Sequence, residues 1–158
     1  MLFFLMLICI SVFAKHKKHK KKSTCKSNIV SVLMHRTACY GTCQDYYIHI
    51  NNDGVVTYTG VRFTPDTGIF TKEIPIDNVK SIFDKLTGFQ VDTCLDLYPN
   101  KIPDLPGLNF DIVYKNKTKK IYCANFGPYF LKDIAKSIDE IGKKTDNNWK
   151  LIPKTTKN

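Results

Sequence analysis

Apolar residues recur at every second position in some segments and at helical spacing in others, and this pattern restricts the possible folds most strongly. Tyr46, Ile48 and Ile50 share one side of an extended segment. The Asn51–Gly54 sequence that follows is typical of a hairpin turn, because Asn, Asp and Gly tolerate positive φ. Val55–Val61 then reads as the partner strand. The first half of the chain is therefore predicted to contain antiparallel strands.

Two further segments are predicted to be amphipathic helices. The first spans Ile76–Leu86, and the second begins at Pro128 and ends at Gly142. Strands joined by hairpins form antiparallel sheets, and helices with one apolar side cover a sheet face. We therefore predict an α+β fold, an antiparallel sheet built from hairpins with both helices packed on one face, in the order β-β-β-β-α-β-β-α. The other predicted strands are Ile29–Met34, Gly68–Ile74, Asn109–Tyr114 and Lys119–Ala124.

The formal net charge of +10 is concentrated near the two ends of the chain. Residues 15–27 are rich in Lys and contain no acidic residue, residues 150–158 are again basic, and the long segment between them is close to neutral. We predict a single domain at 28–149, a basic flexible spacer at 15–27 and a basic tail at 150–158. A folded nucleic-acid-binding domain usually carries its basic residues on its own surface, so no specific nucleic-acid partner is expected.

Residues 1–14, MLFFLMLICISVFA, are interpreted as a signal peptide or apolar leader. Val12 and Ala14 place small residues where cleavage after Ala14 would need them, and the segment is shorter than the ~20 residues that span a bilayer. No Lys or Arg precedes the apolar run and a cationic block follows it, which leaves a misassigned start or a weakly membrane-associating tail as alternatives. The predicted location is secreted or in the cell envelope.

The segment Lys15–Lys22, KHKKHKKK, cannot be buried, because its like charges repel one another. It is predicted to be a solvated spacer or to contact an anionic surface, such as lipid headgroups or acidic polysaccharide, with each Lys contributing ~1 kcal/mol near a charged membrane. The predicted partners are therefore an unknown protein or an anionic surface, with membrane-surface contact through this segment.

Five cysteines follow the leader, and in a small exported domain cysteines form disulfides more often than they catalyse reactions. Because five is an odd number, at least one is free or pairs with another chain, and Cys25 in the predicted spacer is the candidate. Cys39 and Cys43 would close a short loop, or one of them would pair with Cys123. Cys94 paired with Cys123 is a further alternative. The disulfide candidates are therefore Cys39, Cys43, Cys94 and Cys123.

The same region leaves two chemical alternatives open. His35, Cys39, Cys43 and His49 are possible zinc ligands, although their spacing matches no standard zinc finger. Cys39 and Cys43 could act as a redox pair, although thioredoxin-like chemistry uses two intervening residues at a helix amino end. The chain has no phosphate loop, serine elbow or metalloprotease helix. No cofactor and no catalytic residue are predicted.

Two runs of the sequence resemble the signature of an uncharacterised family, domain of unknown function 6438. The first is RTACYGTCQDY at Arg36–Tyr46, where the family has R-T-x-C-x-G-x-C-P-x-Y. The second is DGVVTYTG at Asp53–Gly60, where the family has a D-G-x-V-x-Y-x-G hairpin. The chain departs from the pattern at Gln44, where the family usually has Pro, so the turn after Cys43 is expected to be less rigid.

The resemblance extends over about Val30–Trp149, since the chain also contains Asp104-Leu105-Pro106, Gly127-Pro128 and Ile138-Asp139. It implies a small exported or envelope-associated protein, and it implies no activity. The motif residues in this sequence are Arg36, Gly41, Tyr46, Asp53, Gly54, Asp104 and Pro106.

Two side chains of that motif are expected to form an ion pair, Asp104 with Arg36. Asn116-Lys117-Thr118 is a glycosylation sequon in a predicted turn, which matters only in a eukaryotic secretory pathway. The leading hypothesis is a non-enzymatic exported binding or structural module stabilised by cysteines. The alternatives are a small thiol-redox protein that uses Cys39 and Cys43, and a zinc-stabilised module.

Overall fold

The computed structural model describes residues 25, 27–99, 104–124, 127–144 and 147–153. The leader at 1–14, the segment Lys15–Lys22 and the last five residues lie outside the described part of the chain. The strands are β1 Ile29–Arg36, β2 Asp45–Asn51, β3 Val55–Arg62, β4 Gly68–Glu73, β5 Leu97–Tyr98, β6 Gly107–Tyr114, β7 Thr118–Ala124 and β8 Lys150–Ile152. The helices are α1 Ile76–Gly88 and α2 Tyr129–Gly142.

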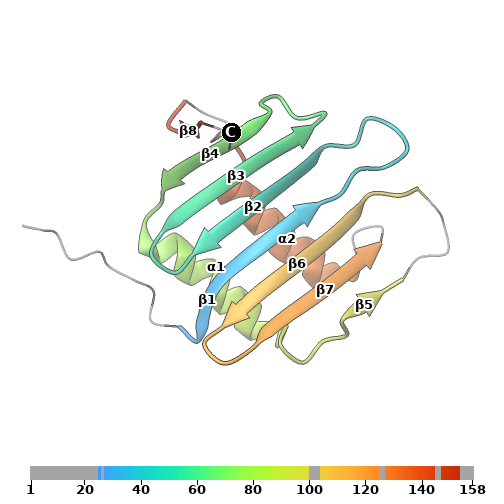
Figure 1. Ribbon diagram of the computed structural model, residues 1–158. Coiled ribbons are helices and arrows are strands. Elements are labelled where there is room, and N and C mark those ends of the chain that lie inside the picture. Colours follow the sequence, from blue (N-terminus) through green and yellow to red (C-terminus); the bar gives the residue numbers. More distant parts are fainter. Residues whose placement is uncertain (1–24, 26, 100–103, 125–126, 145–146, 154–158) are drawn as a thin grey trace, which may run out of the picture.

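These elements form one eight-stranded sheet and two helices (Figure 1). The strand order is β5-β7-β6-β1-β2-β3-β4-β8. All neighbouring strands are antiparallel except β5 and β7, which pair in parallel. The predicted α+β class with a mostly antiparallel sheet is therefore confirmed.

The hairpin between β2 and β3 forms where the turn residues predict it. Gly54 adopts a φ of 86°, and the amide of Val55 donates a hydrogen bond to Oδ1 of Asp53 at 3.1 Å. A Cβ at Gly54 would lie 2.7 Å from the carbonyl oxygen of Ile74, so the turn also needs glycine for space. Asp53 and Gly54 are thus structural residues of this turn.

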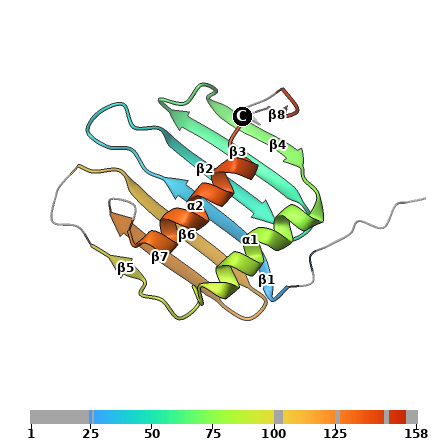
Figure 2. The ribbon, with the colours of Figure 1, turned by 180° about the vertical axis from the view of Figure 1, so that it is seen from behind.

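The core lies between the sheet and the two helices. Figure 2 shows α1 and α2 in front of the same sheet face. Every second residue of β2 is buried, and both helices bury one apolar side. Each large apolar side chain removed from water contributes ~1.5–3 kcal/mol to folding. The largest fully buried side chains include Tyr46, Tyr58, Phe83, Phe110, Ile29, Met34, Ile48 and Ile50.

Helix α2 approaches β2 closely at its carboxyl end. A Cβ built on Gly142 would lie 2.3 Å from Cγ2 of Ile48, which is fully buried. Only a residue without a side chain allows this distance. The contact brings the last turn of α2 directly over β2, and this placement positions the site described below.

The predicted order of elements omitted two strands and is wrong there. β5 lies in a segment with prolines to which no element was assigned, and β8 lies at 150–152, which was assigned to the basic tail. β5 has two residues and lies at the end of the strand order beside β7, so the sequence carries no periodic signal for it. β8 pairs with β4 at the other end of the sheet, next to the buried side chain of Trp149.

Cys25 belongs to the folded part of the chain, although its position in the sequence suggested the spacer. Its side chain is buried, and its amide donates a hydrogen bond to the carbonyl of Asn52 at 2.6 Å. Asn116 is exposed in the turn between β6 and β7. Within the described residues, neither helix combines the length and the apolar character needed to cross a membrane.

Candidate functional site

The connection between β1 and β2 contains a disulfide. The Sγ atoms of Cys39 and Cys43 are 1.96 Å apart, and their Cα atoms are 5.5 Å apart. The connection is held to the start of β6 and to the segment before it. Thr37 and Gly107 exchange hydrogen bonds, and the amide of Tyr40 donates to the carbonyl of Asp104 at 3.2 Å. Of the cysteine pairings that the sequence left open, the structure contains the one between Cys39 and Cys43, which closes the short loop.

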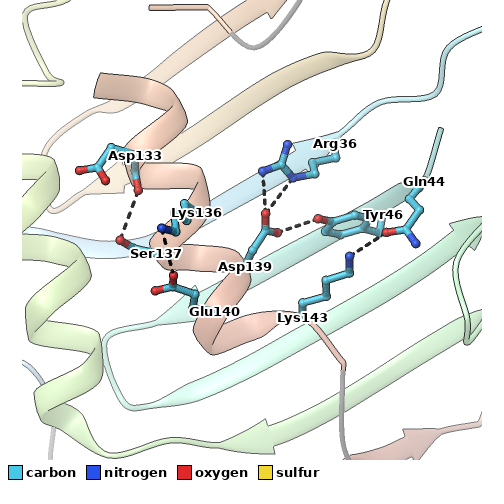
Figure 3. Close-up of polar contacts among 9 residues, drawn as sticks. All are labelled: Arg36, Gln44, Tyr46, Asp133, Lys136, Ser137, Asp139, Glu140 and Lys143. Carbon is cyan, nitrogen blue, oxygen red and sulfur yellow. Dashed lines mark hydrogen bonds and ion pairs between the residues drawn. The ribbon is translucent and has the colours of Figure 1, made fainter. Parts of the chain in front are cut away.

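Three charged or polar side chains meet at Asp139, as Figure 3 shows, and they line the same pocket as Cys43 of the disulfide. Arg36, at the end of β1, donates from Nε at 2.9 Å and from Nη2 at 2.6 Å to Oδ2 of Asp139 in α2. The hydroxyl of Tyr46, in β2, donates to Oδ1 of the same carboxylate at 2.7 Å. Both oxygens of Asp139 therefore accept hydrogen bonds from neighbouring sheet strands.

The protonation states of this cluster follow from its surroundings. Burial, followed by the charge and hydrogen bond of Asp139, raises the pKa of Tyr46 well above its ordinary value of 10.0. Burial alone would lower the pKa of Arg36, but its hydrogen bond to Asp139 and the charge of that carboxylate outweigh burial and raise it. Tyr46 is therefore a neutral hydrogen-bond donor at physiological pH, and Arg36 is a cation.

A second polar contact completes the site. Lys143, directly after α2, donates from Nζ to Oε1 of Gln44 at 2.7 Å, and its ammonium lies 5.3 Å from the centre of the Tyr46 ring (Figure 3). Lys143, Gln44 and Tyr46, together with Arg36 and Asp139, line a pocket of about 310 Å³. The lining residues are Arg36, Thr37, Cys43, Gln44, Tyr46, Pro106, Asp139 and Lys143.

The pocket brings together only part of the predicted motif. Arg36, Tyr46 and Pro106 line it, and Cys43 contributes one sulfur of the disulfide. Gly41 lies in the disulfide loop, and Asp53 and Gly54 form the turn described above, outside the pocket lining.

Asp104 takes a different place from the one predicted. Its side chain is exposed, and its backbone adopts a φ of 61° in the segment before β6. The sequence predicted that Arg36 pairs with Asp104. In the structure, Arg36 instead donates the two hydrogen bonds given above to the carboxylate of Asp139.

The four candidate zinc ligands do not form a metal site in the described residues. Cys39 and Cys43 are bonded to each other and cannot act as thiolate ligands. His35 contacts Oδ1 of Asp45 through Nε2 at 2.9 Å and stacks on Tyr47. In the described part of the chain, no group of three or more His, Cys, Asp or Glu side chains is arranged to hold a metal ion. The described residues therefore do not support the zinc alternative.

The other cysteines of the described chain, Cys25, Cys94 and Cys123, are free. Burial, followed by the charge of Cys94, raises the pKa of Cys123 to about 12. Burial and the charge of Asp84 raise the pKa of Cys25, against the opposing charge of Lys80. Neither buried thiol is therefore activated as a nucleophile.

Sequence reasoning missed the three residues Gln44, Asp139 and Lys143, which make polar contacts in the site, and also Thr37, which lines the pocket. Two signals for them existed. Asp139 is one of the residues that carry the family resemblance, and Gln44 is the position where the chain departs from the family pattern. Lys143 had no such signal, because it lies in a basic stretch with several equivalent lysines.

Comparison with known proteins agrees with the resemblance seen in the sequence. Residues 30–142 match the family described as Domain of unknown function (DUF6438). No curated protein matches the chain. The match covers more than half of the 158 residues and includes the disulfide loop, Tyr46 and Asp139. The chain therefore belongs to the DUF6438 family.

Proposed function

We propose that this domain is a non-enzymatic binding module that works outside the cytoplasm, and that the pocket beside the Cys39–Cys43 disulfide receives a group of its partner. The observation that carries the proposal is the way the pocket wall is built. Asp139 holds Arg36 and Tyr46 in place, and the wall combines these polar groups with the apolar surfaces of Pro106 and the disulfide. Fixed polar groups in a partly apolar hollow are typical of a ligand site.

The chemistry of the wall favours binding over turnover. Tyr46 keeps its proton and uses it in the hydrogen bond to Asp139. Asp139 accepts hydrogen bonds on both oxygens, from Arg36 and from Tyr46. A general acid or base would need a group poised to exchange a proton with a substrate near neutral pH, whereas these groups are occupied with one another.

Two features support a location outside the cytoplasm. Disulfides persist in oxidising compartments and are rare in the cytosol, and Cys39 and Cys43 lie at bonding distance. The apolar residues 1–14 are suited to export. In this proposal, Lys15–Lys22 adds contact with an anionic surface, such as lipid headgroups, while the pocket binds the partner.

The test uses the full chain with a carboxyl-terminal tag, expressed in the cells from which it comes. We expect the protein in the envelope or the medium, with Cys39 and Cys43 joined when peptides are analysed by mass spectrometry without reduction. Cross-linking on intact cells should capture a partner. The substitution Gln44→Trp, which fills the pocket, should abolish capture, whereas Thr42→Trp in the exposed part of the same loop should not.

Two results would contradict the proposal. One is recovery of the protein wholly in the cytosol with both thiols reduced. The other is capture of the same partner by the wild-type chain and by Gln44→Trp with equal yield.

A second candidate, a small thiol-redox protein, is favoured by one observation. Cys43 lines the pocket together with Lys143 and Arg36, and nearby positive charge stabilises a thiolate once the disulfide is reduced. The pH dependence of alkylation of reduced Cys43 distinguishes the two functions. A pKa of the Cys43 thiol below about 7 would support redox activity, and a pKa in the ordinary range of a free thiol would remove it.

A further inference from the structure

The pocket beside the disulfide offers more hydrogen-bond donors than acceptors. The carboxylate of Asp139 is occupied by Arg36 and Tyr46, and Oε1 of Gln44 accepts from Lys143. An ammonium group has three N–H donors, of which Lys143 uses one for Gln44. The amide nitrogen of Gln44 has no acceptor among the described residues. A ligand in this pocket is therefore met mainly by donors.

The pocket also carries surplus positive charge. Arg36 and Asp139 compensate each other, whereas the polar partner of Lys143 is a neutral amide. In the described part of the chain, no carboxylate lies within ion-pairing distance of Lys143. The neighbouring Lys144 shows the contrast, because its Nζ lies 2.7 Å from Oδ2 of Asp66. The carboxyl end of α2 adds a partial negative charge of roughly half a unit, which reduces the surplus without removing it.

A surplus of less than one charge suits a monoanion better than a dianion. A phosphate dianion would bring excess negative charge next to Asp139, and like charges in a partly buried site repel each other. A carboxylate brings one negative charge and two acceptor oxygens, which match the ammonium of Lys143 and the amide of Gln44. The Tyr46 ring and Pro106 offer apolar contact to a short carbon stem.

We propose that the pocket binds the terminal carboxylate of a small organic acid or peptide, with Lys143 and Gln44 as its donors. This inference rests on the proposed binding function and names the chemical class of the ligand. Arg36 and Tyr46 act as positioning residues, because their hydrogen bonds occupy both oxygens of Asp139 and the charge of Arg36 compensates that carboxylate in the pocket wall.

The experiment is a titration of the ¹⁵N-labelled full chain followed by NMR. The probes are butyrate, its neutral isostere butyramide, butylammonium and inorganic phosphate. We expect saturable shifts of the Gln44, Tyr46 and Lys143 amide signals with butyrate, at least tenfold weaker binding of butyramide, and no saturation with butylammonium. Phosphate should bind more weakly than butyrate.

Two matched variants test the role of the charge. Lys143→Met keeps the carbon stem and should weaken butyrate binding at least tenfold, whereas Lys144→Met should change it less than twofold. The same spectra show whether each variant is folded. Acetyl-dialanine with a free carboxyl end, compared with its carboxyl amide, distinguishes a peptide source from a free small acid. The free-acid peptide should bind more tightly than butyrate if the source is a peptide end, and more weakly if it is a small acid.

The carboxylate assignment is overturned if butyramide binds as tightly as butyrate, if Lys143→Met leaves butyrate binding unchanged, or if none of the probes shifts the pocket signals. The cross-linking test with Gln44→Trp is scored separately. If that variant loses the partner while butyrate fails to bind, only the ligand class is wrong. If the variant keeps the partner and butyrate also fails, the binding function of the pocket is wrong as well.

Discussion

Asp139 connects two strands of the sheet to the last turn of α2 through its two carboxylate oxygens. It accepts hydrogen bonds from Arg36 in β1 and from Tyr46 in β2, and the relative exposure of both charged side chains is only about a fifth, 22% for Arg36 and 21% for Asp139. An ion pair that is largely removed from water is costly to break, because the remaining charge loses its partner without regaining full hydration. The order of the pocket wall therefore depends on this one residue.

The substitution Asp139→Ala should lower the free energy of unfolding by about 2–3 kcal/mol, because it removes the acceptor of hydrogen bonds from a charged guanidinium and a buried phenol. Urea unfolding followed by circular dichroism measures the effect. Glu140→Ala is the control, since Glu140 is exposed in the same helix and its ion pair with Lys136 spans 3.9 Å. That variant should stay within about 0.5 kcal/mol of wild type. Equal losses in both variants would show that the Asp139 contacts contribute nothing specific.

At the scale of elements, the site depends on how α2 lies against β2. Gly142 allows the end of the helix to contact Ile48 closely, and Asp139 and Lys143 then reach over the strand to Tyr46 and Gln44. The two helices are also joined to each other, since Nζ of Lys85 in α1 contacts Asp133 at 3.0 Å and Ser137 at 2.8 Å in α2.

The substitution Gly142→Ala should lower the free energy of unfolding by about 1–3 kcal/mol, because the new methyl group would overlap the buried side chain of Ile48. Gly88→Ala is the matched control. Gly88 is the last residue of α1, and a Cβ there would meet no atom within 4 Å. Alanine restricts the unfolded chain, so this variant should be as stable as wild type or up to about 1 kcal/mol more stable.

Butyrate affinity, measured on the same two proteins, tests whether the helix placement matters for the pocket. Gly142→Ala should shift α2 and weaken butyrate binding. Gly88→Ala should not shift the helix and should leave butyrate binding unchanged. Unchanged stability in Gly142→Ala would show that β2 and α2 separate at no cost.

At the scale of the whole molecule, a buried thiol and a partly buried phenol couple folding to pH. Burial, followed by the charge of Cys94, raises the pKa of Cys123 to about 12 from its ordinary value of 9.0. Burial, followed by the charge of Asp92, raises the pKa of Tyr114 to about 12 from 10.0. Both groups keep their protons in the folded chain at pH values where the unfolded chain releases them.

The contribution of these two groups to the free energy of unfolding should therefore be nearly constant below pH 9. It should fall as the pH rises from about 9 towards 12. In that range the unfolded state binds fewer protons than the folded state, so each such group lowers the free energy of unfolding by up to about 1.4 kcal/mol per pH unit. Urea unfolding at pH 8, 9, 10 and 10.5 measures the slope.

The variant Cys123→Ala should be less stable than wild type at pH 8, because it loses buried contacts, and should show a shallower decline above pH 9. The difference between the two proteins should shrink by about 1 kcal/mol between pH 9 and pH 10. Parallel curves would show that the thiol of Cys123 ionises as easily in the folded chain as in the unfolded one.

Most of the secondary structure could be predicted from the sequence, because the alternation of apolar residues is a local property. The helices α1 and α2 and the hairpin of β2 and β3 lie where periodicity and turn residues place them. The short loop between Cys39 and Cys43 was one of several pairings that the sequence allowed. β5 and β8 were not predicted, because strands of two or three residues are too short to show an alternation of apolar and polar residues.

The sequence alone determined the class of fold and the main hairpins, and it limited the disulfide to a few possible pairings. The tertiary structure decided the site. Asp139 is 103 positions from Arg36 and 93 from Tyr46, and Lys143 is 99 positions from Gln44. Nothing local distinguishes Lys143 from its neighbours or pairs Asp139 with Arg36. These contacts exist because the end of α2 packs against β2, and that packing depends on the whole apolar core.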